Sequence, residues 1–465
     1  MTMLGRLVHR ARTLAISLTT SLWFIPGMIV GLSIALAFLL VMLSERIDAQ
    51  ALAGFPRLFG VSAAGSRDML STIAGSIITV AGVTFSITIA ALALASAQYT
   101  PRVLRTFMSD KANQVVLGTF VGIYSYCLVI LRTIRGSEED VFVPSIAVLG
   151  GFLLALVGVG VLIFFIHHIA VGLQVSIILD RVRRVTERAI AHRFPELATD
   201  ATDATDDDPP TTIASAAGGG GWQTVAAERT GYVQAIDRDG LISLAREQAL
   251  AIRLEREVGD FVTAGAPLIS IARVSEDTPS RATGAANAAG ASAMPTRSLS
   301  GLLTIDTHRT VEQDPSFGAQ QIVDIALKAL SPGVNDTTTA VMCVDHLGAI
   351  LARVAERRLA PRQSTESDGP RLIGGNPTFA SLVALALDDI RRNARGNVTV
   401  LDRLIDAIES IAPFARHPGR RRVLVAQIDK LADAAIRWVD APSDRAQLVE
   451  RAGTARKALV ETTLA

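Results

Sequence analysis

The sequence predicts an all-α membrane domain of four transmembrane helices, followed by a water-facing α+β part. The mean hydropathy of the 465 residues is +0.37, and the apolar excess lies in residues 22–172, whereas residues 175–465 carry charges throughout. Within this second part, short alternating segments between turn-forming residues indicate a small β barrel-sandwich-like module. Amphipathic segments after that module indicate a helical domain.

Four apolar runs define the predicted membrane domain, residues 1–185. Each run is close to the roughly 20 residues that an α-helix needs to cross the hydrocarbon core. Because backbone polar groups inside lipid must be hydrogen-bonded within the chain, we expect these runs to be helices. They lie at about residues 22–43, 71–97, 115–131 and 144–170.

Lys and Arg residues predict how these helices are oriented, because cytoplasmic loops of membrane proteins carry an excess of them. Three stretches hold roughly twice as many Lys and Arg residues as the other connections. They are the stretch before the first run, the connection between the second and third runs, and the stretch after the fourth. We therefore expect both termini, and the whole water-facing part, to be cytoplasmic.

The second apolar run is chemically different from the others. It contains no charged residue, and hydroxyl side chains alternate with glycine and alanine. Hydroxyl-rich walls can replace the hydration shell of an ion, so this helix is a candidate pore lining. Small residues and hydroxyls also let helices approach closely, so a tightly packed central helix is the alternative. The candidate pore-lining residues are Ser76, Thr79, Thr84, Ser86 and Thr88.

Three basic side chains are candidate membrane-interface residues. His167 and His168 lie near the end of the fourth run, and Arg102 follows the second run just after a proline. Neighbouring residues on a helix point about 100° apart, so the two histidines cannot easily bind one metal. An ionisable residue at membrane depth is a functional candidate, and two ordinary interfacial side chains are the alternative.

Two stretches of the water-facing part are expected to be flexible linkers. Residues 198–225 are acidic and then glycine-rich, and residues 275–300 are rich in small polar residues. Between them, residues 226–274 form the predicted β module, whose glycine and valine pattern resembles the barrel-sandwich fold of biotinyl and lipoyl carriers. Those carriers need a modifiable lysine, and this stretch contains none. The resemblance therefore extends to the fold and argues against a carrier function.

Residues 301–465 predict a helical cytoplasmic domain. An amphipathic helix over Phe317–Leu330 ends at a polar turn, and Asp336 is the expected N-cap of the next helix. Free amides at a helix N-terminus hold anions, so the turn is a candidate ligand loop, and a plain helix–helix turn is the alternative. The loop candidates are Ser331, Asn335, Asp336 and Thr337. Further helices are expected at about residues 377–394, 398–414 and 420–463.

Composition and motifs argue against several classes of function. A net charge of +1 gives no reason to expect a nucleic-acid partner. The sequence has no phosphate-binding lysine loop, dinucleotide fingerprint, HExxH, CxxC or GxSxG motif. We therefore expect no enzyme activity, no cofactor and no metal site. Cys127 and Cys343 lie in different parts of the chain, so we expect no disulfide.

Several long segments resemble a known family, the bacterial predicted membrane proteins grouped as domain of unknown function 2254. The resemblance covers nearly the full chain in order and departs at Thr337 and Thr338, where the family pattern has proline and an aromatic residue. It implies a multi-pass protein of the bacterial cytoplasmic (inner) membrane, and it implies no mechanism because the family has no assigned activity. The segments are LWFIP (22–26), STIAGSIITVAGVTFSITIAALALASAQYTPRVLRTFMSD (71–110), NQVVLGTFVGIYSY (113–126), LIFFIHHIA (162–170), GDFVTAGAPL (259–268) and EQDPSFGAQQIVDIALKALSPGVNDTTTA (312–340).

Two functional hypotheses follow, and the lipid bilayer is a partner in both. The first is a homo-oligomeric channel in which the second span lines a pathway for a small ion. The second is a membrane-anchored sensor or scaffold that binds a small ligand or a partner through its cytoplasmic domain. A secondary transporter is disfavoured, because four spans are few and no Asp or Glu lies inside any predicted span.

Overall fold

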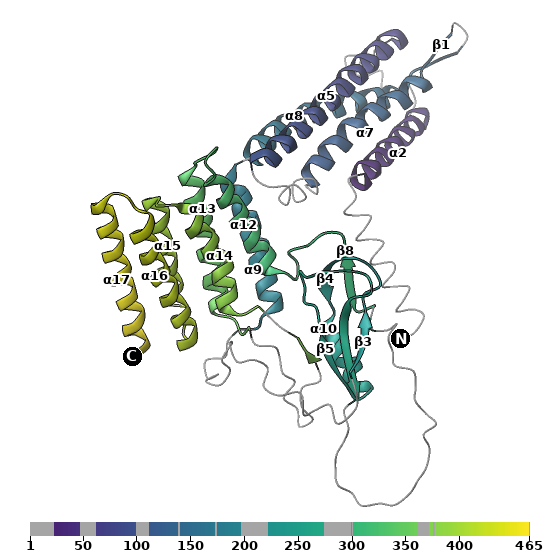
Figure 1. The fold of residues 1–465 in the computed structure, drawn as a ribbon. Coiled ribbons are helices and arrows are strands. Elements are labelled where there is room, and N and C mark those ends of the chain that lie inside the picture. Colours follow the sequence, from purple (N-terminus) through teal and green to yellow (C-terminus); the bar gives the residue numbers. More distant parts are fainter. Residues whose placement is uncertain are drawn as a thin grey trace, which may run out of the picture. The chain divides into compact units, whose positions relative to one another are not determined.

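The computed structural model describes residues 23–46, 62–98, 111–137, 140–172, 174–196, 222–273, 299, 301–359, 372–374 and 377–464 (Figure 1). They divide into two compact units, Met1–Ile177 and Ile178–Ala465. The first unit holds the predicted spans, and the second holds the β module and the C-terminal helices. Most of the two predicted linkers, residues 198–221 and 275–298, lies outside the described residues.

Each of the four predicted spans coincides with one long helix. The largest difference is at the second span, where the helix begins at Ala63 rather than at residue 71. Its first turns include Arg67 and Asp68, because a charged residue ends the apolar run without ending the helix. The helices are α2 (Phe24–Arg46), α5 (Ala63–Gln98), α7 (Lys111–Thr133) and α8 (Ser145–Gly172).

Within the described residues, five helices are long and apolar enough to cross a membrane: these four and α13 (Thr337–Ala355). The fifth lies in the second unit, where it packs against other helices of that unit. Cys343, Val344 and Leu347 on α13 are fully buried there. Burial inside protein therefore accounts for the apolar composition of α13 without a membrane.

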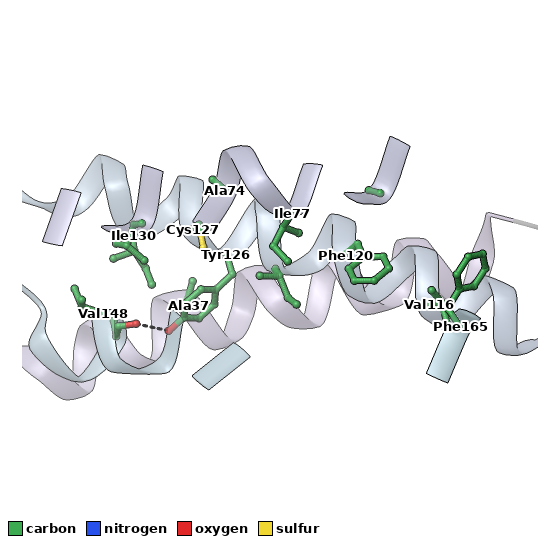
Figure 2. Close-up of a cluster of buried hydrophobic side chains, with 14 of the residues drawn as sticks. Ala37, Ala74, Ile77, Val116, Phe120, Tyr126, Cys127, Ile130, Val148 and Phe165 are labelled. Carbon is green, nitrogen blue, oxygen red and sulfur yellow. Dashed lines mark hydrogen bonds between the residues drawn. The ribbon is translucent and has the colours of Figure 1, made fainter. Parts of the chain in front are cut away.

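The third span, α7, is the central helix of the membrane unit and packs against α2, α5 and α8. Phe120, Tyr126, Cys127 and Ile130 on this helix are fully buried (Figure 2). The Tyr126 hydroxyl donates a hydrogen bond of 2.8 Å to the Ala147 carbonyl in α8 (Figure 2). This bond lets a tyrosine hydroxyl lie in an apolar core without losing its hydrogen bond.

A short antiparallel hairpin, β1 (Arg135–Ser137) and β2 (Asp140–Phe142), connects α7 to α8. Next to it, Arg67 Nη2 donates to the Ile134 carbonyl over 2.7 Å, just past the end of α7. This contact satisfies a carbonyl that the end of a helix leaves unpaired. It also ties the first turns of α5, which precede the apolar run, to the end of α7.

The second unit begins within α9 (Val175–Arg193) and continues into a β module of two small sheets (Figure 1). The sheet orders are β3-β7-β5-β9 and β6-β4-β8, and the only parallel pair among these described strands is β5–β9. Val233, Ile252 and Ile269 are fully buried in the core of the module. The elements are β3 (Gln223–Ala226), β4 (Gly231–Ile236), α10 (Arg238–Glu247), β5 (Leu250–Leu254), β6 (Phe261–Val262), β7 (Pro267–Arg273), β8 (Leu303–Asp306) and β9 (Leu372–Ile373).

The two sheets include strands from outside residues 226–274. β3 begins at Gln223, β8 pairs with β4, and β9 pairs with β5 from a distant part of the chain. Residues 303–306 and 372–373 were expected in the helical domain. Alternating apolar and polar residues indicate that a segment is a strand, but they do not indicate which distant segment will pair with it.

Six helices make up most of the rest of the second unit. Asp336 is the N-cap of α13, as predicted, and its side chain accepts a bond from the Thr339 amide. The expected single helix over 420–463 is wrong, because Pro442 begins a new helix; proline is tolerated in the first turn of a helix and breaks its interior. The helices are α12 (Pro315–Ala329), α13, α14 (Phe379–Ala394), α15 (Val398–Ile411), α16 (Pro418–Trp438) and α17 (Pro442–Leu464).

The helix that follows the last span, α9, packs directly against α12. Gly318 on α12 faces Thr186 on α9, and both are buried. A Cβ atom on Gly318 would overlap Thr186 Oγ1 and would lie 2.9 Å from Thr186 Cβ. Glycine therefore sets how closely these two helices approach.

Candidate functional site

The outer face of α5 carries a stripe of small and hydroxylated residues. Its members are three or four residues apart, a spacing that places them on one side of a helix. The opposite side of α5, which includes Leu70, Ala74 and Ala81, is buried in the bundle. We call the exposed set the hydroxyl–glycine stripe: Thr72, Gly75, Thr79, Gly82 and Ser86.

Two glycines of this stripe have open space around them. A Cβ atom on Gly75 or Gly82 would meet no atom within 4 Å, whereas one on Gly150 would lie 2.5 Å from the Tyr126 hydroxyl. Packing of the bundle therefore does not explain the glycines of α5. Open glycines also occur at Gly27, Gly31 and Gly160. Only on α5, among the described spans, do open glycines alternate with exposed hydroxyls.

The hydroxyls of the stripe use their protons inside the helix. Thr79 Oγ1 donates to the Gly75 carbonyl over 2.8 Å, and Ser86 Oγ donates to the Gly82 carbonyl over 2.9 Å. A hydroxyl oxygen also has two acceptor lone pairs, which donation of its proton leaves available. One turn before Thr72, the exposed carboxylate of Asp68 continues the same face. The stripe therefore presents acceptor oxygens along its length.

The five residues predicted to line a pore do not share one face of α5. Ser76, Thr79 and Ser86 are exposed, and Thr88 is half-buried. Thr84 is 3% exposed, and its hydroxyl has no hydrogen-bond partner. Only Thr79 and Ser86 belong to the stripe. Residue type alone could not separate the two faces, because hydroxyls occur on both.

The predicted interface residues lie in the last turns of α8. His167 is exposed, and His168 is half-buried with its ring stacked on Phe164 at 5.5 Å between centroids. Arg102, the third candidate, lies outside the described residues. Within the described ranges, no group of three or more His, Cys, Asp or Glu side chains could hold a metal ion.

The candidate ligand loop is a turn whose polar side chains are largely hydrogen-bonded to other groups of the protein. Asp336 accepts from the Thr339 amide at 3.0 Å and from the Thr339 hydroxyl at 2.6 Å, and these bonds hold the pKa of its carboxyl below the usual range. The Thr337 hydroxyl accepts from the Asn397 side chain over 2.8 Å. Ser331 Oγ donates to a backbone carbonyl. Asn335, with φ +48°, takes the left-handed conformation that such turns require.

Sequence reasoning missed a charged cluster where α9, the β module and α12 meet, which we call the charged joint. Arg193, the last residue of α9, is largely buried. Its Nη1 donates to the Gln313 carbonyl over 2.6 Å, and its Nη2 lies 3.4 Å from Glu257. Arg238 also reaches Glu257, over 2.8 Å.

The other half of the charged joint is Asp314, the N-cap of α12. Its carboxylate accepts from Arg309 Nε at 3.0 Å and from the Phe317 amide at 3.1 Å. Burial raises the pKa of Asp314, against the opposing effect of Arg309. Gly259, with φ +98°, allows the β module to approach, since a Cβ there would lie 2.7 Å from Arg309 Nη2. Arg193 reaches Glu257 and Gln313 from 64 and 120 residues away, so the sequence alone shows only isolated charges there.

Comparison with known proteins places most of the chain in a family of predicted membrane proteins. Residues 19–410 match the family described as "Predicted membrane protein (DUF2254)". The "Uncharacterized protein Rv1290c" of Mycobacterium tuberculosis and the "Uncharacterized protein Mb1321c" of Mycobacterium bovis are each 32% identical to the chain. Both comparisons cover 96% of this chain and 84% of the relative. No solved structure matches it.

Proposed function

For this chain, which belongs to the predicted membrane protein family DUF2254, we propose a non-enzymatic function as a homo-oligomeric channel of the bacterial cytoplasmic membrane, with α5 lining the pathway. The hydroxyl–glycine stripe is the observation that carries the proposal. It runs along a membrane-spanning helix and points away from the bundle of its own subunit. A second copy is the partner that gives such a face both close packing and a shared axis.

The chemistry of the stripe favours a small cation as the conducted species. The hydroxyl oxygens of the exposed residues Thr79 and Ser86 can accept and so take the place of water around a cation, as rings of oxygen atoms do in selectivity filters. Asp68 would form a ring of carboxylates at one end of the same face. The stripe holds no Lys or Arg.

The distribution of Lys and Arg supports a cytoplasmic location for both termini and the second unit. A reporter enzyme that folds only outside the cytoplasm, fused after Ala465, should be inactive. If that fusion is active and a cytoplasmic reporter at the same position is inactive, the orientation is the opposite of the one proposed.

Planar-bilayer recordings of the purified full-length protein test the channel. We expect cation-selective currents whose unit conductance falls in Thr79→Trp, because the indole would fill the stripe. Phe85→Trp is the matched control, since Phe85 is an exposed residue of α5 outside the stripe. Equal changes of unit conductance in the two variants would show that the stripe of α5 does not line the pathway. No current under voltage, tension or added ions would rule out the channel itself.

A membrane-anchored sensor or scaffold is the second candidate. Its support is the exposed apolar side chain of Val334, which lies beside Asn335 at the tip of the candidate ligand loop. A ligand of this loop should raise the melting temperature of the full-length protein, because binding to the folded state stabilises it. The shift should disappear in Val334→Asp. A ligand that stabilises both proteins equally binds elsewhere.

A further inference from the structure

The helix α9 follows the last membrane span almost without interruption. The Gln174 amide donates to the Val171 carbonyl, and the Ile177 amide donates to the Gln174 carbonyl, each over 3.1 Å. Since an α-helix rises 1.5 Å per residue, Arg181 lies about 9 Å along the helix axis from Val175. Whatever direction α9 takes, its first basic residues stay near the end of α8.

The side chains of α9 divide into three faces. An apolar face that includes Ile178, Leu179 and Ile190 is buried in the second unit. A second face carries both signs of charge, because Arg183 pairs with Asp180 at 2.6 Å and with Glu187 at 2.7 Å. The third face has basic residues at intervals of three and four and no acidic one. We call it the basic strip: Arg181, Arg184, Arg188 and His192.

The arginines of the basic strip differ in exposure and in pairing from Arg183 and Arg193. Arg183 is held by its two carboxylates, and Arg193 is largely buried in the charged joint. In contrast, Arg184, Arg188 and His192 are exposed, and Arg181 is half-buried. Arg184 lies 2.9 Å from Asp180 with 57% of its side chain exposed, and an exposed pair of this kind holds a side chain only weakly. It can therefore exchange that carboxylate for another anion.

We propose that the basic strip of α9 binds the headgroups of anionic phospholipids at the membrane surface. The partner is chosen by chain continuity and by charge: the strip directly follows a membrane-spanning helix, and its charges are all of one sign. The planar guanidinium matches a phosphate through two parallel hydrogen bonds. Each basic side chain at an anionic surface strengthens the attraction roughly fivefold, and the effect fades beyond about 8 Å at physiological salt.

A fluorescent label on α9 can measure this contact in the full-length protein. Cys127 and Cys343 are fully buried, so a thiol-reactive dye will label an added cysteine at Ala191→Cys, an exposed position beside the strip. The labelled protein is reconstituted in nanodiscs whose lipids carry a headgroup quencher. One set of discs contains phosphatidylcholine alone, and the other also contains phosphatidylglycerol.

We expect stronger quenching in the phosphatidylglycerol discs, and loss of that difference when Arg181, Arg184 and Arg188 are all changed to Gln. The matched control changes Arg416, Arg422 and Arg437 to Gln, three exposed arginines at and before α16, and should keep the difference. Equal quenching of the unsubstituted strip in both lipids would overturn the proposal, as would equal losses in the two triple variants.

A salt titration needs no substitution in the strip and covers the case in which the triple variant fails to fold. Added salt should remove the phosphatidylglycerol-dependent quenching, because it screens exposed charges. Quenching that depends on phosphatidylglycerol but does not change with salt would show an apolar contact, and this too would refute the proposal.

Discussion

Replacing Gly318 with alanine should loosen the packing of α12 on α9. The added Cβ would overlap Thr186 Oγ1 and would lie 2.9 Å from Thr186 Cβ and 3.0 Å from Thr186 Cγ2. Rotation of the threonine cannot clear the space, because its Cβ is itself too close and its hydroxyl donates to the Val182 carbonyl over 2.8 Å. The two helices must therefore separate.

Overpacking of a close-packed core costs about 1–3 kcal/mol, and a contact between two fully buried residues should be near the upper end. We expect Gly318→Ala to destabilise α12 by about 3 kcal/mol. Thr186→Ala removes two of the three crowding atoms at the cost of a small cavity, so alone it should cost about 1 kcal/mol. The double variant should be less destabilised than the sum of the two, by about 1–2 kcal/mol.

Hydrogen–deuterium exchange of the full-length protein, followed in peptides that cover α12, measures the local loss of stability. A loss of 3 kcal/mol corresponds to exchange about a hundredfold faster. Gly453→Ala is the control, since a Cβ on that glycine of α17 would meet no atom within 4 Å. The exchange rates give the free energy of opening of α12. A value for Gly318→Ala within about 0.5 kcal/mol of that of the unsubstituted protein would refute the reasoning, as would a double variant whose loss equals the sum of the two single losses.

Three further substitutions test other contacts. Asp336→Ala should destabilise the first turn of α13 by about 1 kcal/mol. The lowered pKa of Asp336 means that this contribution is present above the unfolded pKa and is lost as pH falls through the folded pKa. The protection factor of the Thr339 amide, which is the exchange rate of an unstructured amide divided by that of Thr339 at the same pH, should therefore fall in acid in the unsubstituted protein and show no such step in the variant. Tyr126→Phe should lower the free energy of unfolding by about 1 kcal/mol, because it removes the hydrogen bond to the Ala147 carbonyl. The melting temperature in detergent should therefore fall, and an unchanged value would count against that bond. Arg420→Met should cost about 2–4 kcal/mol, because the buried guanidinium donates to the carbonyl of Ala355, the last residue of α13, and to that of Arg357 just beyond it. Chemical denaturation should show that Arg420→Lys restores only part of the loss.

The spans could be predicted from sequence because lipid demands a long apolar run, and such a run has no competing explanation in residues 22–172. Their ends were less predictable. α5 begins at Ala63, before the apolar run, and its first turns include Arg67, whose bond to the Ile134 carbonyl is a tertiary contact that the sequence does not show. The break in the predicted helix over 420–463 was visible in Pro442, which stands at the start of α17. Local patterns therefore predicted where the helices lie better than where they begin and end.

The candidate site was predictable in its location and unpredictable in its geometry. Composition singled out the second span, but Thr79 and Thr84 have the same side chain on opposite faces of one helix. Only the packing of α5 in the bundle decides which face remains outside. The charged joint was invisible for a different reason, because Glu257 and Asp314 are ordinary surface residue types until Arg193 and Arg309 are placed beside them.

The parallel pair β5–β9 has a consequence for synthesis of the protein on the ribosome. β5 ends at Leu254, yet the strand that completes its sheet is not translated until Leu372 and Ile373 emerge. At typical elongation rates the ribosome needs several seconds or more to cover that distance. Meanwhile the edge of β5 has unpaired backbone groups, and such edges recruit other strands. The four spans, by contrast, are complete at the N-terminal end of the chain and can enter the membrane first. The nascent protein would therefore be tethered to the bilayer while its β module waits for a last strand.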